Sequence, residues 1–150
     1  LSWECLPRLV YFLSSGYSDS EYYHHLTKEY EGNKIVMAPE FTMNTGISYT
    51  QAIKSSLFKS FTATTSVTGF GTQYFDEANT MKQDPYFLWN MDLGISGKHI
   101  DFHVWGKNIL DKNFFCYMFN SPVGNNLPEY MKSGQSGAPS RFGASITIKL

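Results

Sequence analysis

The sequence predicts an all-β protein, an antiparallel up-and-down meander of about six strands. Three observations predict this fold. Apolar and polar side chains alternate over several stretches of about ten residues, the connections between those stretches alternate between short and long, and no segment shows a convincing 3.6-residue period. Because successive side chains of a strand point to opposite faces, each such stretch has one apolar face and one polar face.

The clearest strand is Phe41–Thr50, where four of the five odd-numbered residues are apolar or aromatic and no even-numbered residue is. The same alternation recurs in Phe87–Ser96 and in the last ten residues, Arg141–Leu150. Two further stretches, Phe61–Thr68 and Ile100–Trp105, alternate more weakly. These five segments are predicted strands with a defined facing.

A sixth predicted strand, Leu9–Ser18, has a continuous apolar centre, so the pattern leaves its facing open. About six residues follow Thr50 before the next strand, and a two-residue turn at Gly97-Lys98 joins another pair. The remaining connections are long, namely 19–39, 75–85 and 110–140. Short turns at one end of a meander and long loops at the other are typical of bacterial outer-membrane barrels.

The composition of the polar faces favours a wet, enclosed lumen over a soluble surface. These faces carry mostly Thr, Ser, Gly and Asn, whereas the solvated face of a soluble sheet is usually rich in Lys, Glu and Asp. The apolar faces carry aromatic residues toward both ends, as a lipid-facing surface does. We expect the lipid-facing side chains to be Phe41, Met43, Ile47, Tyr49, Phe61, Phe87, Trp89, Met91, Leu93, Phe102, Phe142, Ile146 and Ile148.

Charge and hydropathy exclude several other classes. The 150 residues suit one domain, and 12 basic against 13 acidic residues leave a net charge of −1, which argues against nucleic acid as a partner. No apolar run approaches the length of about 20 residues that a transmembrane helix needs. A soluble β-sandwich or barrel that binds a partner through its aromatic loops shares the alternation and remains an alternative.

Three segments resemble motifs of the TonB-dependent outer-membrane receptors. Val104–Lys112 is similar to the "aromatic–Gly–Lys–Asn–Leu–x–Asp–Lys" segment near the end of that family, and Gly137–Gly143 to the "Gly–x–Pro–Arg–x–x–Gly" that opens its closing strand, with Ser140 as an additional residue. Gly32–Asn44 resembles the family's "Gly–Asn … Ala–Pro–x–x–Thr–x–Asn". The matching positions of the two later segments are Gly106, Lys107, Asn108, Leu110, Asp111, Lys112, Pro139, Arg141 and Gly143.

The resemblance implies that residues 1–150 form the C-terminal portion of a transmembrane β-barrel of about 22 strands in the outer membrane of a Gram-negative bacterium. The plug domain and the earlier strands would be absent from this chain. Such receptors take up ferric siderophores or similar scarce ligands, energised by the TonB–ExbB–ExbD system through the plug, and lipid surrounds the barrel. The resemblance implies no covalent chemistry, and therefore no enzyme and no cofactor. A passive porin-type barrel is an alternative within the outer membrane.

Aromatic and imidazole side chains in the long connections are the candidate ligand-binding residues. Rings with polar tips can stack on a planar ligand and donate hydrogen bonds to it. These candidates are Tyr22, Tyr23, His24, His25, Tyr30, Tyr74, Phe75, Phe115, Tyr117 and Tyr130. His24 and His25 lie near two glutamates, but the spacing matches no metal-ligand pattern, so no metal site is expected. Cys5 and Cys116 would lie at opposite rims and are expected not to bond to each other.

Overall fold

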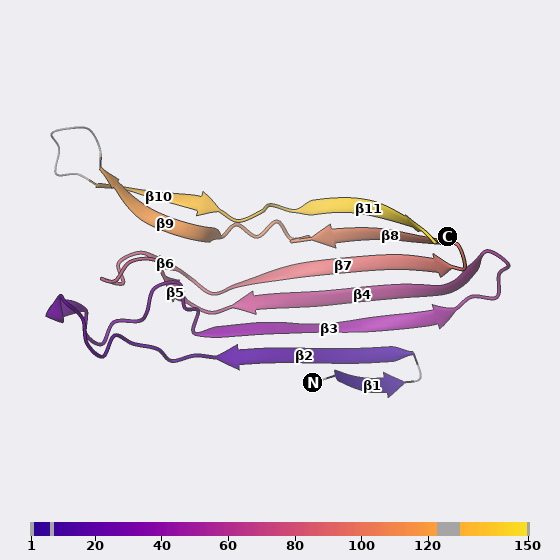
Figure 1. Cartoon of the computed structure of the whole chain (residues 1–150), viewed down its shortest axis with the longest axis horizontal. Helices are drawn as coiled ribbons and strands as arrows, with labels where there is room; N and C mark the ends of the chain where they lie inside the picture. The colour runs from indigo at the N-terminus through magenta and orange to yellow at the C-terminus, as the bar shows by residue number, and fades with distance from the viewer. Residues whose placement is uncertain (1, 7, 123–129, 150) are drawn as a thin grey trace.

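The main element is one antiparallel sheet of seven strands. The computed structural model describes the backbone of residues 2–6, 8–122 and 130–149 and the side chains of residues 8–121 and 132–149. The strands of the sheet, in spatial order, are β1 (Ser2–Leu6), β2 (Leu9–Tyr17), β3 (Phe41–Ala52), β4 (Phe58–Phe70), β7 (Tyr86–Gly97), β8 (Ile100–Lys107) and β11 (Arg141–Ile148). Figure 1 shows the short turns at one end and the long connections at the other. The predicted antiparallel up-and-down meander is confirmed.

The structure adds strands that the alternation did not predict. β1 makes seven strands in the sheet instead of about six. The predicted loop 110–140 is wrong over much of its length, because β9 (Phe115–Pro122) and β10 (Tyr130–Ser136) pair within it as a hairpin that extends beyond β8 and β11 (Figure 1). The short strands β5 (Gln73–Tyr74) and β6 (Lys82–Gln83) pair in the second long connection, and a single 3₁₀ turn, η1 (Lys28–Tyr30), lies in the first. The β9 segment is apolar on both parities, so it carries no period-2 signal.

The register of the sheet brings the apolar sides of the strands onto one face. Ile47 of β3 is opposite Thr65 of β4, which is opposite Met91 of β7. Side chains opposite each other on antiparallel strands point to the same side. Following the opposite partners from β7 through β8 to β11 places all thirteen of the residues expected to face lipid on this same side of the sheet. We call this side the apolar face. It also settles the open facing of β2, since Leu9, Tyr11 and Leu13 lie on the apolar face.

The apolar face is exposed in this chain. Phe142, Ile146 and Ile148 are 63–72% exposed, and Phe87, Met91 and Leu93 are also exposed. Among the described side chains the buried hydrophobic residues are Phe75, Met81 and Tyr86, which lie at the loop end. The sheet therefore forms a single layer that does not enclose a hydrophobic core of its own, and the described part of the chain shows no second layer packed on the apolar face.

Glycines allow aromatic rings to cross neighbouring strands closely. A Cβ on Gly69 would lie 2.6 Å from the ring of Phe87 on the apolar face, and a Cβ on Gly143 would lie 2.4 Å from the indole of Trp105 on the opposite face. A side chain at either position would displace the ring. Such pairs, in which an aromatic ring covers a glycine, help to fix the register of a sheet.

Candidate functional site: the interlocked loops

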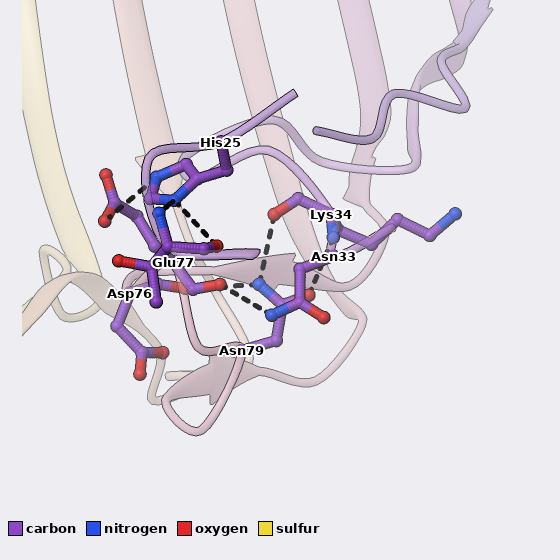
Figure 2. A network of polar contacts seen from close by, with 7 residues as sticks. His25, Asn33, Lys34, Asp76, Glu77 and Asn79 are labelled. Atoms are coloured by element: carbon purple, nitrogen blue, oxygen red, sulfur yellow. Dashed lines mark hydrogen bonds and ion pairs between the residues drawn. The ribbon is translucent and has the colours of Figure 1, made fainter. Parts of the chain in front are cut away.

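Asn79 joins the first two long connections into one unit. We call residues 18–40 the first loop and residues 71–85 the second loop. The Oδ1 atom of Asn79 accepts from the backbone N–H of Lys34 (2.7 Å), and its Nδ2 donates to the carbonyl of Lys34 (3.0 Å) (Figure 2). Asn33 Nδ2 donates to the carbonyl of Glu77 (2.7 Å). Asn79 has a φ of 56°, a left-handed conformation that Asn tolerates better than most residues.

Two of the predicted first-loop residues, Tyr22 and Tyr30, lie around a third, His25. Its ring lies 5.1 Å from that of Tyr22 and 5.3 Å from that of Tyr30, and its Nε2 lies 3.4 Å from Glu77 Oε2 of the second loop. The His25 side chain is 15% exposed, so it forms part of the interior of the loop unit. Figure 2 shows the imidazole directed toward Glu77.

Tyr23 and His24 stand apart from that cluster. Their rings lie 4.7 Å from each other, and His24 Nδ1 lies 3.6 Å from Glu31. Tyr23 is 86% exposed. This pair is therefore the part of the first loop that presents aromatic surface to solvent.

Lys34 holds the base of the first loop. Its Nζ donates to Asp19 Oδ1 (2.6 Å) and Glu21 Oε1 (2.7 Å), and the backbone of Lys34 forms an isolated antiparallel bridge with Glu21. These two carboxylate hydrogen bonds raise the pKa of Lys34 well above its usual range. The ends of the loop are thus held by charge-assisted hydrogen bonds.

The β9–β10 hairpin carries an aromatic stripe that is half exposed. Phe115, Tyr117 and Phe119 are 40–42% exposed, and the rings of Tyr117 and Phe119 stack at 5.8 Å. Phe75 is only 7% exposed, and its ring contacts Tyr117 edge-on at 6.3 Å. Phe75 is therefore a packing residue within the loops. Tyr74 is half-buried at β5, and the side chain of Tyr130 lies outside the described residues.

Aromatic stacking and one glutamine attach this hairpin to the sheet. Tyr86 stacks between Phe70 (5.2 Å) and Phe114 (4.5 Å), and Gln83 Oε1 accepts from the backbone N–H of Phe115 (2.8 Å). The sequence did not predict these contacts, because they join residues of β4, β6 and β7 to residues at the start of β9, which are far away in the sequence. The aromatic residues Phe70, Tyr86, Phe114 and Phe115 were the available signal, and nothing in the sequence pointed to Gln83.

The two C-terminal segments that resemble receptor motifs, Val104–Lys112 and Gly137–Gly143, contact each other through Asn108 and Asp111. The Asn108 side chain is 4% exposed, donates to the carbonyls of Lys112 (3.0 Å) and Ala138 (3.1 Å), and accepts from the N–H of Lys112 (2.9 Å). Asp111 Oδ1 accepts from the N–H of Ser140 (2.8 Å). The motif residues therefore brace the chain where it leaves β8 and where it enters β11.

The face opposite the apolar face is lined by paired polar groups. Ser48 and Thr64 hydroxyls lie 2.9 Å apart, and His103 Nδ1 lies 3.1 Å from Asp92 Oδ1. An open recess of about 290 Å³ lies on this face, with Asn90, Asp92, Trp105 and Lys107 among its lining residues. We call this side the polar face. It can bind water or a polar partner.

No other chemical centre is found in the described residues. They contain no group of three or more His, Cys, Asp or Glu side chains that could hold a metal ion, and none of their helices is long and apolar enough to cross a membrane. Cys116 is a free, exposed thiol, and the side chain of Cys5 lies outside the described residues, so the prediction about their pairing stays a prediction.

Comparison with known proteins identifies the fold. No family model matches the sequence. The structure is similar to that of the ferric yersiniabactin uptake receptor FyuA from Yersinia pestis, with a TM-score of 0.76 and 18% sequence identity. The match covers 98% of this chain and 22% of the receptor chain. The chain therefore has the fold of one part of that receptor and spans about a fifth of its length.

Proposed function

We propose that this chain forms part of the wall of a TonB-dependent outer-membrane receptor that imports a ferric siderophore or a similar scarce ligand. The observation that carries the proposal is the two-sided character of a single-layer sheet. One face is apolar and exposed across the six strands of the sheet whose side chains the structure describes, the opposite face is polar, and the long loops lie at one end. A hydrocarbon exterior and a hydrated interior account for both faces.

Polar groups on the apolar face support a hydrocarbon environment because they are paired. The hydroxyls of Tyr11 and Thr45 hydrogen-bond to each other (2.9 Å), and the indole Nε1 of Trp89 donates to Thr65 Oγ1 (2.6 Å). Water would satisfy these groups on a soluble surface, whereas lipid cannot. The pairing is what a lipid-facing position requires.

The edges of the sheet support the view that further strands complete a barrel. Among the described residues, β1 pairs only with β2 and β11 pairs only with β8. Unpaired backbone groups at such edges cannot be satisfied in a bilayer, so a closed barrel needs strands from elsewhere in the receptor.

The first loop and the β9–β10 hairpin are the proposed ligand-binding side of the chain. Tyr23 and His24 on the first loop and Phe115, Tyr117 and Phe119 on β9 offer exposed rings above the sheet. Such rings can stack on the planar groups of a metal chelate. The similar solved structure is a receptor for ferric yersiniabactin, so that chelate is the first probe to use.

Uptake of radioactive iron by cells tests the proposal. The receptor containing this chain is produced in a Gram-negative host without other siderophore receptors, with tonB intact or deleted, and supplied with ferric yersiniabactin or a ferric tris-catecholate. We expect uptake of at least one chelate only when tonB is intact. Equal uptake without tonB would favour a passive porin-type barrel. Recovery of the protein from the soluble fraction, monodisperse without detergent, would favour the soluble binding domain.

A further inference from the structure

The rim of the sheet at the short turns carries cations without acidic partners. Arg8 lies between β1 and β2, and Lys98 lies in the turn between β7 and β8. Lys54 lies in the turn between β3 and β4, and Lys59 is the second residue of β4. Among the described side chains none of these four forms an ion pair. The one described carboxylate at this rim, Asp101, is held by Lys149 at 2.8 Å.

Two of these cations lie on the side of the apolar face. Arg8 Nη1 donates to Gln51 Oε1 (2.6 Å), which also accepts from the hydroxyl of Tyr49 (2.7 Å). Tyr49 and Gln51 point to the apolar face, so the guanidinium is held at that side, and Gln51 is the one hydrogen-bond partner of the guanidinium among the described side chains. Lys59 is paired with Ile53, whose N–H donates to the carbonyl of Lys59 (2.8 Å), and this continues the β3–β4 register past Gln51 and Phe61 and places Lys59 on the same side. Arg8 is paired with Thr50, so the two cations are separated by two strand spacings across the sheet and three residues along it, about 14 Å between their backbones.

A bulge in β4 leaves Lys59 without a cross-strand partner in β7. The register between β4 and β7 shifts between Phe58 and Ser60, so Lys59 has no opposite residue in β7. Bulges commonly redirect a side chain at the edge of regular pairing. Lys59 is exposed, and its stem can follow the apolar surface while its ammonium reaches the interface.

An apolar groove begins next to these cations. Small side chains of β4, Ala63 and Thr65, form its floor, and Ile47, Tyr49, Met91 and Leu93 form its walls, enclosing about 220 Å³. A second recess of about 230 Å³ shares Ile47 and Thr65 with it and continues toward Val67. The groove therefore runs along β4, away from the cationic rim and into the apolar face.

We propose that Arg8, Lys59 and the groove over β4 form a binding site for an anionic glycerophospholipid of the leaflet that the short turns face. The phosphodiester and the anionic headgroup contact the two cations, and an acyl chain lies along the groove. A soluble phosphate compound would have no use for the groove, and a neutral lipid would leave the cations unpaired. The site rests on the proposed function, because it presumes that the apolar face is in a bilayer.

Native mass spectrometry of the receptor containing this chain tests the site. The receptor is purified in nonionic detergent micelles that contain equal amounts of dioleoyl phosphatidylglycerol and dioleoyl phosphatidylcholine, and the lipids retained are counted. One cation near an anionic headgroup changes affinity by about fivefold. We therefore expect retention of phosphatidylglycerol over phosphatidylcholine by about fivefold or more, and near-equal retention in the double variant Arg8→Gln, Lys59→Gln.

Three further variants locate the effect. The double variant Lys28→Gln, Lys132→Gln removes the same charge at the loop end and should keep the preference, as should the charge-conserving double variant Arg8→Lys, Lys59→Arg. Ala63→Leu fills the groove and should lower the occupancy of both lipids without abolishing the preference. Heat-modifiable mobility on gels checks that every variant is folded.

The outcomes separate this site from the proposed function. Equal retention of the two lipids by the unmodified receptor overturns the site, as does an equal loss of preference in the loop-end variant. Unchanged occupancy in Ala63→Leu overturns the groove as the place of the acyl chain. In a separate reconstitution, failure of the receptor to insert into vesicles of either lipid overturns the proposed function, and the lipid site with it.

Discussion

The sheet and the loop end satisfy their apolar side chains in different ways. The loops enclose Phe75, Met81 and Tyr86, each 4–7% exposed, whereas Ile146 and Ile148 in the sheet are 63% and 72% exposed. The loop end is therefore stabilised by contacts within the chain, and the sheet depends on surroundings that cover its apolar face. The effect of a substitution on stability should therefore depend on the surroundings in the sheet and much less so at the loop end.

The largest expected effect is a charge on the middle of the apolar face. Leu93→Arg places a cation between Ala63 and Val104, far from either rim. In a bilayer this should destabilise the folded receptor by about 2–4 kcal/mol, measured by urea titration in vesicles. The matched control is Thr64→Arg on the polar face, for which we expect about 1 kcal/mol or less. Equal destabilisation by both would remove the distinction between the faces.

At the loop end the largest effect should come from Asn108. Asn108→Ala leaves two carbonyls and one N–H without their partner in a buried place, and it puts alanine at a φ of 50°. We expect a loss of about 2–3 kcal/mol in local stability, seen as faster amide exchange in 108–112 and 138–141. Asn108→Gly removes the backbone strain and should recover only part of the loss. The exposed neighbour Asn113 serves as control, and Asn113→Ala should change little.

The sequence predicted the sheet well because its signal is local. Alternation within a single strand identified five of the seven strands and an apolar run identified a sixth, β2; the register in the structure aligns the apolar faces of β3, β4 and β7. β1 has five residues, too few for a clear period, and β9 is apolar on both parities. The predicted strand boundaries also differ from the observed ones, since β4 begins at Phe58 and the predicted strand begins at Phe61.

The loop unit could be predicted only as a set of residue types. Aromatic residues in the long connections suggested a binding surface, and the structure gathers Tyr22, His25 and Tyr30. The contact that fixes the unit, however, joins Asn79 to Lys34, 45 positions apart in the sequence. No periodicity reports such a contact, and the roles of these aromatic residues in ligand binding stay predictions.

Asn79 should control whether the first two loops move together. Asn79→Ala removes the paired hydrogen bonds to the backbone of Lys34 and leaves alanine at a φ of 56°. We expect the local stability of the first loop to fall by about 1–2 kcal/mol, measured as amide exchange at Lys34, with little change in the sheet. Asn79→Asp keeps the acceptor for the Lys34 N–H and should lose less. Exchange in β3 that rises as much as in the loop would show that the regions are not independent.

The smallest expected effect is at the exposed ion pairs of Lys34. Lys34→Met removes the contacts to Asp19 and Glu21 and should slightly increase proteolysis within the first loop, because exposed ion pairs contribute little and are screened by salt. Since the carboxylates raise the pKa of Lys34, the contribution is fully present below the ordinary pKa of lysine and is lost only as the pH rises through the raised value. Proteolysis of the unmodified loop should therefore be the same at pH 6 and pH 9 after correction for the protease. A clear increase between those two values would mean that another group, and not Lys34, sets the stability of this loop.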